Sequence, residues 1–185
     1  MRVIGGIAKG RKLKFPKLSK GQKTRPLTEQ VREALFNILV EEVGGCRFLD
    51  LFAGTGAVGI EALSRGAAVC FFVEMDKKAV AVIRDNLGTT GFSDQSEIYS
   101  IDVLKAITLF NRKQAFFDVI YIGAPYNNPI LEETLKALSS GSILNATSMI
   151  VAEHRKDHEL ADNYDSLKRC RQSKYGDTVL SFYKR

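Results

Sequence analysis

Short apolar stretches alternate with helical patterns from residue 47 to residue 152, and this alternation constrains the fold more than any other feature. Strands that alternate with helices build a parallel sheet with helices on both faces. Two later segments, 166–173 and 178–183, predict a closing antiparallel hairpin, so the expected class is α/β. The predicted strands span 47–51, 69–73, 97–101, 118–122 and 149–152, and the predicted helices span 57–65, 77–87, 103–111 and 130–139.

The first 25 residues, here called the basic leader, differ in charge from the rest of the chain. They carry nine basic side chains and no acidic one, which leaves 18 basic and 21 acidic residues beyond them. The net charge is therefore +9 in the leader and −3 in the remainder. This asymmetry is typical of a protein whose N-terminal part contacts a polyanion, most often nucleic acid. A solvated tail is the alternative.

Apolar residues interrupt the leader at strand-like spacing, which a disordered tail would not need. Residues 2–4 and 12–15 predict two short strands of a basic hairpin. A helix is expected next, because Thr28 is a candidate N-cap and apolar residues repeat at helical spacing beyond it. We expect residues 1–43 to form an N-terminal extension and residues 44–185 to form the main domain.

A chain of 185 residues suits one domain better than two full-sized ones. Its apolar runs are shorter than the roughly 20 residues of a bilayer span, and no secretory signal follows Met1, so a cytoplasmic protein is expected. The cysteines, Cys46, Cys70 and Cys170, are far apart and form no C-x-x-C pair. They are expected to be buried, reduced thiols, with neither a disulfide nor a zinc site.

The most specific local motif is the glycine loop DLFAGTGAVG at residues 50–59, where the first predicted sheet strand meets a helix. Gly54 and Gly56 let the backbone turn tightly and approach a ligand closely. Glu74 ends the second strand, 20 residues after Gly54, where a carboxylate accepts hydrogen bonds from ribose hydroxyls. Together these residues predict a site for a nucleoside-bearing cofactor.

Two cofactor classes use such a crevice, the nicotinamide dinucleotides and S-adenosylmethionine (SAM). Asp50, just before the glycines, favours SAM, because a carboxylate attracts its cationic aminoacyl and sulfonium end and repels a pyrophosphate. The chain is also too short for the separate substrate domain of most dehydrogenases. A nicotinamide-dependent oxidoreductase is the less favoured alternative.

Five stretches of the sequence resemble a bacterial family that methylates the N2 amine of a guanine in 16S ribosomal RNA, the guanine-966 type. They are RVIGGIAKGRKL, TRPLTEQVREALFNIL, FLDLFAGTGAVGIEALSRGA, FFVEMD and YGDTVLSFY. The resemblance implies a Rossmann-like SAM-dependent methyltransferase fold. It also implies a mainly parallel seven-stranded sheet with a C-terminal antiparallel hairpin, preceded by the basic hairpin and helix.

The resemblance implies roles for individual residues. Glu74 would hold the ribose hydroxyls of SAM, Met75 would pack on the adenine, and Asp102 with Val103 would lie at the adenine edge. The residues lining the rest of the cofactor would be Asp50, Phe52, Gly54, Thr55 and Gly56.

The implied partner is 16S ribosomal RNA or the small ribosomal subunit, bound by a monomer that has no membrane association. Arg32 is expected near the target base, because VREALFNIL adjoins the site in the family. The expected phosphate contacts are Arg2, Lys9, Arg11, Lys12 and Arg25.

The family's fourth strand ends in Asp-Pro-Pro followed by Tyr or Phe, and the candidate catalytic residues here read Gly123, Ala124, Pro125 and Tyr126. A guanine amine is a poor nucleophile, and the motif carboxylate and a backbone carbonyl normally accept its N–H bonds. Gly123 lacks that carboxylate, although the carbonyls of Gly123 and Ala124 remain and Tyr126 can stack on a flipped-out base. The nearby polar side chains that could replace it are Asn127, Asn128 and Asp118.

Two function hypotheses therefore stay open. The first is direct, in-line methyl transfer from SAM to guanine N2 without a metal or a covalent intermediate, slowed by the missing acceptor. Such a loss typically costs on the order of 10²- to 10⁴-fold in rate. The second is a catalytically weakened RNA-binding or ribosome-binding protein that retains the SAM pocket.

One pair of histidines has a spacing that can bind a metal, because His154 and His158 are four residues apart. They lie in the charged segment 153–158, and no further ligand cluster is evident. A solvated surface is the favoured interpretation, and no metal site is predicted.

Overall fold

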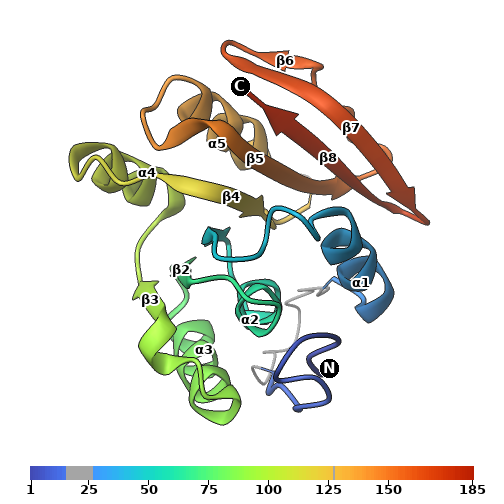
Figure 1. The fold of residues 1–185 in the computed structure, drawn as a ribbon. Helices are drawn as coiled ribbons and strands as arrows, with labels where there is room; N and C mark the ends of the chain where they lie inside the picture. Colours follow the sequence, from blue (N-terminus) through green and yellow to red (C-terminus); the bar gives the residue numbers. More distant parts are fainter. Residues whose placement is uncertain (16–26, 127) are drawn as a thin grey trace.

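The computed structural model describes residues 1–15, 27–126 and 128–185, and the strands of this part form one eight-stranded sheet (Figure 1). The strand order is β3-β2-β1-β4-β5-β8-β7-β6. The strands are β1 (Arg47–Leu51), β2 (Val69–Val73), β3 (Ser96–Tyr99), β4 (Phe117–Ile122), β5 (Leu144–Arg155), β6 (Asn163–Tyr164), β7 (Leu167–Tyr175) and β8 (Thr178–Lys184).

The first five strands pair in parallel, and the last three join them antiparallel. Chain order along the sheet reverses at β1, which has β2 on one side and β4 on the other. In open α/β sheets, ligands bind at such a point, outside the carboxyl ends of the strands. The fold therefore directs attention to the ends of β1 and β4.

Helices cover both faces of the sheet, and the alternation of side chains along each strand gives each face its own core. In β4, Val119 and Tyr121 face a core shared with α1, α2 and α3, whereas Ile120 and Ile122 face α4 and α5. The helices are α1 (Glu29–Ile38), α2 (Ala57–Ser64), α3 (Lys77–Thr90), α4 (Val103–Arg112) and α5 (Ile130–Ser139), with a 3₁₀ turn η1 (Ser93–Gln95).

The predicted class, the parallel strands and the closing hairpin are confirmed. Three details were wrong. The described sheet has eight strands instead of seven, because the two-residue strand β6 pairs with β7. Strand β5 continues past the predicted 149–152 to Arg155, since residues 150–155 pair with β8. The two leader strands are reduced to a single antiparallel bridge between Arg2 and Lys12.

Residues 1–15 of the leader pack against α2, the helix that follows the glycine loop. Val3, Ala8 and Leu13 are buried in the core shared with α1 and the sheet. Gly6 approaches α2 so closely that a Cβ atom would lie 1.7 Å from the Ser64 carbonyl oxygen, which only glycine avoids. The first 15 residues are therefore integrated into the main body of the protein.

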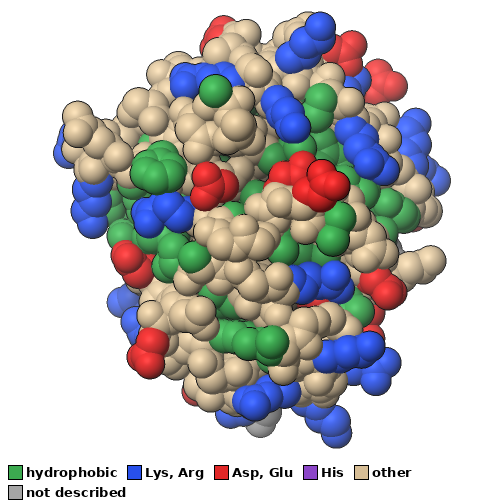
Figure 2. Space-filling view, viewed as in Figure 1, with side chains coloured by type: hydrophobic (Ala, Val, Ile, Leu, Met, Phe, Trp, Pro, Cys, Tyr) green, Lys and Arg blue, Asp and Glu red, His purple; other side chains and the backbone are tan. Residues whose placement is uncertain are grey.

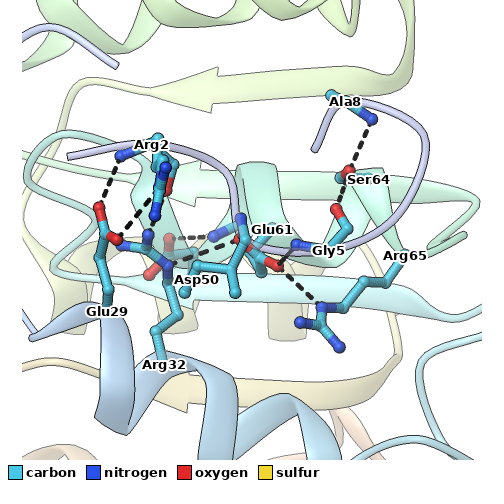
Figure 3. Close-up of polar contacts among 11 residues, drawn as sticks. Arg2, Gly5, Ala8, Glu29, Arg32, Asp50, Glu61, Ser64 and Arg65 are labelled. Atoms are coloured by element: carbon cyan, nitrogen blue, oxygen red, sulfur yellow. Dashed lines mark hydrogen bonds and ion pairs between the residues drawn. The ribbon is translucent and has the colours of Figure 1, made fainter. Parts of the chain in front are cut away.

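A fully buried carboxylate, Glu61 of α2, holds this arrangement together (Figure 3). It accepts hydrogen bonds from the backbone N–H groups of Ile4 at 2.8 Å and Gly5 at 2.7 Å. The guanidinium of Arg65 donates to it at 2.8 Å, and Nε of the buried Arg32 lies 3.6 Å from it. A buried carboxylate persists only when it is paired and hydrogen-bonded in this way.

In the part of the chain that the structure describes, no helix has the length and apolar character needed to cross a membrane.

Replacing Glu61 with Ala should lower the free energy of unfolding by about 3–5 kcal/mol, because Arg32 would remain buried without its counter-charge. Urea unfolding measures this change. The matched control is Asp85→Ala, which removes an exposed ion pair with Lys14 at 2.9 Å and should cost less than about 1 kcal/mol. Equal, small losses in the two variants would contradict the role assigned to Glu61.

Candidate functional site

The glycine loop forms a sharp turn from the end of β1 into α2. Phe52, Gly54 and Gly56 all have positive φ angles, of 62°, 56° and 75°. Gly56 occupies the N-cap position of α2, and no side chain caps the helix there. Of the first three N–H groups of α2, that of Gly59 donates to Asp50, so those of Ala57 and Val58 are the ones a ligand at the carboxyl end of β1 would meet.

Asp50 lies beneath this loop, almost fully buried, and accepts a hydrogen bond from the Gly59 N–H at 2.9 Å. Burial raises the pKa of Asp50 to about 7, although the Gly59 hydrogen bond opposes the shift. The carboxyl group therefore changes protonation state near neutral pH. A cation bound beside it would stabilise the ionised form.

Glu74 connects the end of β2 to the glycine loop. Its two carboxylate oxygens accept from the Gly54 N–H at 2.8 Å and from the Asp76 N–H at 2.9 Å. Met75, the next residue, has 71% of its surface exposed, which is unusual for a large apolar side chain. Glu74 thus offers carboxylate oxygens as hydrogen-bond acceptors, and Met75 offers an exposed apolar surface next to them.

The remaining predicted cofactor residues border the same edge of the sheet. Asp102 caps α4 by accepting from the N–H groups of Leu104 at 3.0 Å and Lys105 at 3.1 Å, and Val103 is buried behind it. Thr55 is mostly buried, and its carbonyl accepts from Asn86 Nδ2 at 3.0 Å. These acceptor groups suit a nucleoside carrying a cationic amino acid, as SAM does.

The four predicted catalytic residues follow β4 directly. Gly123 is half-buried, Ala124 is buried and Pro125 is exposed. The hydroxyl of Tyr126 donates to Glu153 Oε1 at 2.5 Å, and the hydroxyl of Tyr121 donates to Glu153 Oε2. We call these three side chains, Tyr121, Tyr126 and Glu153, the Glu153 cluster.

Sequence reasoning missed the Glu153 cluster, because segment 153–158 was expected to be a solvated surface. For Glu153 and His154 that expectation was wrong, since both are buried in β5, at 6% and 3% exposure. The available signal was strand alternation: Glu153 is two residues after Val151, which pairs with Tyr121. Extending the predicted strand would have placed Glu153 and Tyr121 on one face.

Two of the candidate replacements for the missing carboxylate have other partners. Asp118 lies at the opposite end of β4, where it accepts from the Arg47 N–H at 2.8 Å and from Asn145 at 3.2 Å. Asn128 accepts from the Ile130 N–H at 3.0 Å at the start of α5. Asn127 lies outside the described residues.

The predicted RNA contacts fall into two groups. Arg2, Lys9, Arg11 and Lys12 are exposed on the leader, where Arg11 Nη1 donates to the Thr89 carbonyl at 2.6 Å. Arg25 lies outside the described residues. Figure 2 shows Lys and Arg side chains scattered over one face of the molecule, with carboxylates among them.

Arg32 differs from the other predicted RNA contacts because its side chain is fully buried. Its Nη2 donates to the Arg2 carbonyl at 2.5 Å, and its Nε faces Glu61. In the described residues, Nε and Nη1 have no hydrogen-bond partner. Arg32 therefore joins α1 to the leader and to α2, and it offers RNA no exposed surface.

The histidines and cysteines have ordinary structural surroundings. His154 Nε2 contacts Ser181 Oγ at 2.9 Å, and His158 Nε2 lies 3.2 Å from Glu132. Cys46 and Cys70 are buried as expected, but the prediction for Cys170 was wrong, because it is exposed on β7. Among the described residues, no group of three metal-ligating side chains occurs.

Residues 1–184 match the family described as conserved hypothetical protein 95. The YlbH protein of Bacillus subtilis is 37% identical over 185 residues, covering 100% of this chain and 99% of the relative. Ribosomal RNA small subunit methyltransferase D of Escherichia coli is 34% identical over 160 residues, covering 86% of this chain and 77% of the relative.

Among solved structures, the yhhF protein of Escherichia coli matches with a TM-score of 0.85 and 30% identity, over 100% of this chain and 97% of that one. The match to the family runs from the leader through the glycine loop to the closing hairpin. The chain therefore belongs to the conserved hypothetical protein 95 family.

Proposed function

We propose that this protein is a SAM-dependent methyltransferase that acts on ribosomal RNA of the small subunit. The observation that carries the proposal is the placement of Asp50 and Glu74 against the glycine loop at the point where the strand order reverses. The name of the Escherichia coli relative, ribosomal RNA small subunit methyltransferase D, supports the substrate class.

Bound SAM supplies an activated methyl group that an acceptor nitrogen can attack directly. The carboxylate of Asp50 attracts the cationic end of the cofactor, and the N–H groups at the start of α2 face its carboxylate end. Glu74 accepts hydrogen bonds from the ribose, and the exposed Met75 packs on the adenine. These residues bind and orient the cofactor, so the protein contributes mainly through positioning.

The acceptor in this proposal is the N2 amine of a guanine in 16S ribosomal RNA. In this proposal Tyr126 stacks on the base, and the carbonyls of Gly123 and Ala124 accept its N–H groups. The exposed basic residues of the leader contact phosphates. The protein acts as a monomer in the cytoplasm, on the RNA or on the small ribosomal subunit.

One observation favours a second function, a binding protein that retains SAM without turnover. Gly123 offers no side-chain acceptor at the end of β4. The activity measurement below distinguishes the two functions.

SAM affinity should rise with pH up to about pH 7 and level off above it. The cationic ligand prefers the ionised form of Asp50, whose pKa burial raises to about 7, so proton release accompanies binding below that pH. Calorimetry between pH 6 and pH 8 measures the effect, which is at most about tenfold per pH unit.

Asp50→Asn should weaken binding and remove the part of the pH dependence that belongs to this carboxyl. The comparison also controls for titration of the ligand's own amino group. Glu74→Gln should weaken binding while keeping the pH dependence. An affinity with the same pH profile in wild type and Asp50→Asn would contradict the role of Asp50.

Lys9→Ala and Arg11→Ala should each weaken RNA binding and reduce its dependence on salt, because each side chain contacts a phosphate and releases counterions. The logarithmic salt slope should fall by about 0.7–0.9 per lost contact, with SAM affinity unchanged. Arg112→Ala, on α4 at the other face of the sheet, is the matched control. An unaltered slope in the leader variants would argue against the leader as the RNA-binding surface.

The proposed function predicts methyl transfer from labelled SAM to small ribosomal subunits that lack the modification. Mass spectrometry of the digested RNA should identify N2-methylguanosine. If SAM binds but no product forms, the protein is the binding protein described above. Tight binding of NADH without binding of SAM would instead support an oxidoreductase.

A further inference from the structure

The Glu153 cluster is a buried carboxylate that holds two phenols beside the proposed methyl-transfer site. Both carboxylate oxygens of Glu153 are engaged, one by Tyr121 and the other by Tyr126. With its proton donated to Glu153, the Tyr121 oxygen has only acceptor capacity left. A hydroxyl held in this way can accept a hydrogen bond from an N–H group but cannot donate one to it.

The hydroxyl of Tyr121 lies beside the residue that lacks an acceptor. A Cβ atom built on Gly123 would lie 3.5 Å from Tyr121 Oη and 3.0 Å from Tyr121 Cε1. The phenol therefore fills space into which a side chain at position 123 would extend. Tyr121 also pairs with Asp50 across the β1–β4 register, which places the phenol next to the cofactor carboxylate.

Other carboxylates near the cofactor site are committed elsewhere. Asp50 accepts from Gly59 beneath the glycine loop, and Glu74 accepts from Gly54 and Asp76. Burial raises the pKa of Glu153, against the effect of its two phenol hydrogen bonds, so its carboxylate takes up a proton more readily. Glu153 is thus the described carboxylate best placed to receive a proton near Gly123.

This inference rests on the proposed transfer of a methyl group to an amine. We propose that Tyr121 Oη, held by Glu153, accepts the N–H of the methyl-accepting amine in place of the side chain that Gly123 lacks. Tyr121 is then a catalytic residue, and Glu153 is a positioning residue that also stores the proton.

The proton balance follows from this arrangement. The nitrogen lone pair forms the new N–C bond, the electrons of the broken methyl–sulfur bond return to sulfur, and the positively charged nitrogen releases one proton. That proton passes to Tyr121 Oη as the tyrosine's own proton moves to Glu153 Oε2. Tyrosine and product are then neutral, and Glu153 returns its proton to water before the next turnover.

Single-turnover methyl transfer to small ribosomal subunits, at saturating SAM, tests the proposal. Tyr121→Phe and Glu153→Gln should lower the rate by on the order of 10²-fold or more. Their SAM affinity should stay close to that of the wild type, while the loss of a buried hydrogen bond should lower the melting temperature. Tyr183→Phe is the matched control, because it removes a buried phenol whose hydroxyl donates to the Ala161 carbonyl at 2.9 Å, away from the site.

A rescue variant separates this role from a structural one. The double variant Gly123→Asp, Tyr121→Phe should transfer methyl groups at least about tenfold faster than Tyr121→Phe alone. Phenylalanine leaves room for a carboxylate acceptor where the hydroxyl was. Gly123→Asp alone should give no increase, since the Tyr121 hydroxyl, 3.5 Å from the new Cβ, still occupies the space of the carboxylate; the 3.0 Å contact with ring carbon Cε1 is common to both backgrounds. A residue needed only for packing would not be rescued by a new carboxylate.

A wild-type rate in Tyr121→Phe would overturn the inference, and so would a double variant no faster than Tyr121→Phe. If Glu153→Gln does not fold, Tyr121→Phe decides the question, because it removes a single oxygen atom. Failure of the proposed function has a different signature: the wild type itself then forms no methylated RNA although it binds SAM.

Discussion

The buried carboxylate of Glu61 is the interaction on which the position of residues 1–15 depends. It lies on α2, whose first turn forms part of the cofactor site, and it accepts the backbone N–H groups of Ile4 and Gly5. Arg32 and Arg65 balance its charge from α1 and from α2 itself. Burying a carboxylate without partners costs a large amount of free energy. Residues 1–15, α1 and α2 are therefore expected to pack around Glu61 in one cooperative step. Residues 1–15 and the helix that follows the glycine loop are therefore held together by this buried carboxylate.

A row of polar side chains lies near the carboxyl ends of β1, β4 and β5, on the face of the sheet that α1, α2 and α3 cover. Asp50 of β1 pairs with Tyr121 of β4, and Tyr121 contacts Glu153 of β5. All three are buried where an apolar core would be more stable, and each is hydrogen-bonded. Buried polar residues kept at such a cost are a common mark of a functional site. The cofactor carboxylate and the proposed proton acceptor are thus held by adjacent strands.

Local patterns predicted most of the fold, because each depends on residues close together in sequence. The glycine loop, the N-cap Thr28 and the apolar strands are signals of this kind. The contacts of Glu61 and the Glu153 cluster were not predicted, because the interacting residues are far apart in the sequence. Ile4 and Glu61 are separated by 57 residues, and Tyr121 and Glu153 by 32. For Glu153, strand alternation would have been a signal only if the predicted strand had been extended to residue 155, and the charged residues Arg32 and Glu61 on helices carry no local signal that tells a buried, paired position from an exposed one. For this reason Arg32 was expected near the target base, although its side chain is fully buried.

The most direct test of the account is the structure of this protein with S-adenosylhomocysteine bound. The account predicts the ribose at Glu74, the adenine against Met75 and the amino acid end above Asp50, with residues 1–15 still docked on Glu61. A ligand bound away from the ends of β1 and β4 would contradict it. So would a leader displaced from α2 when the cofactor binds.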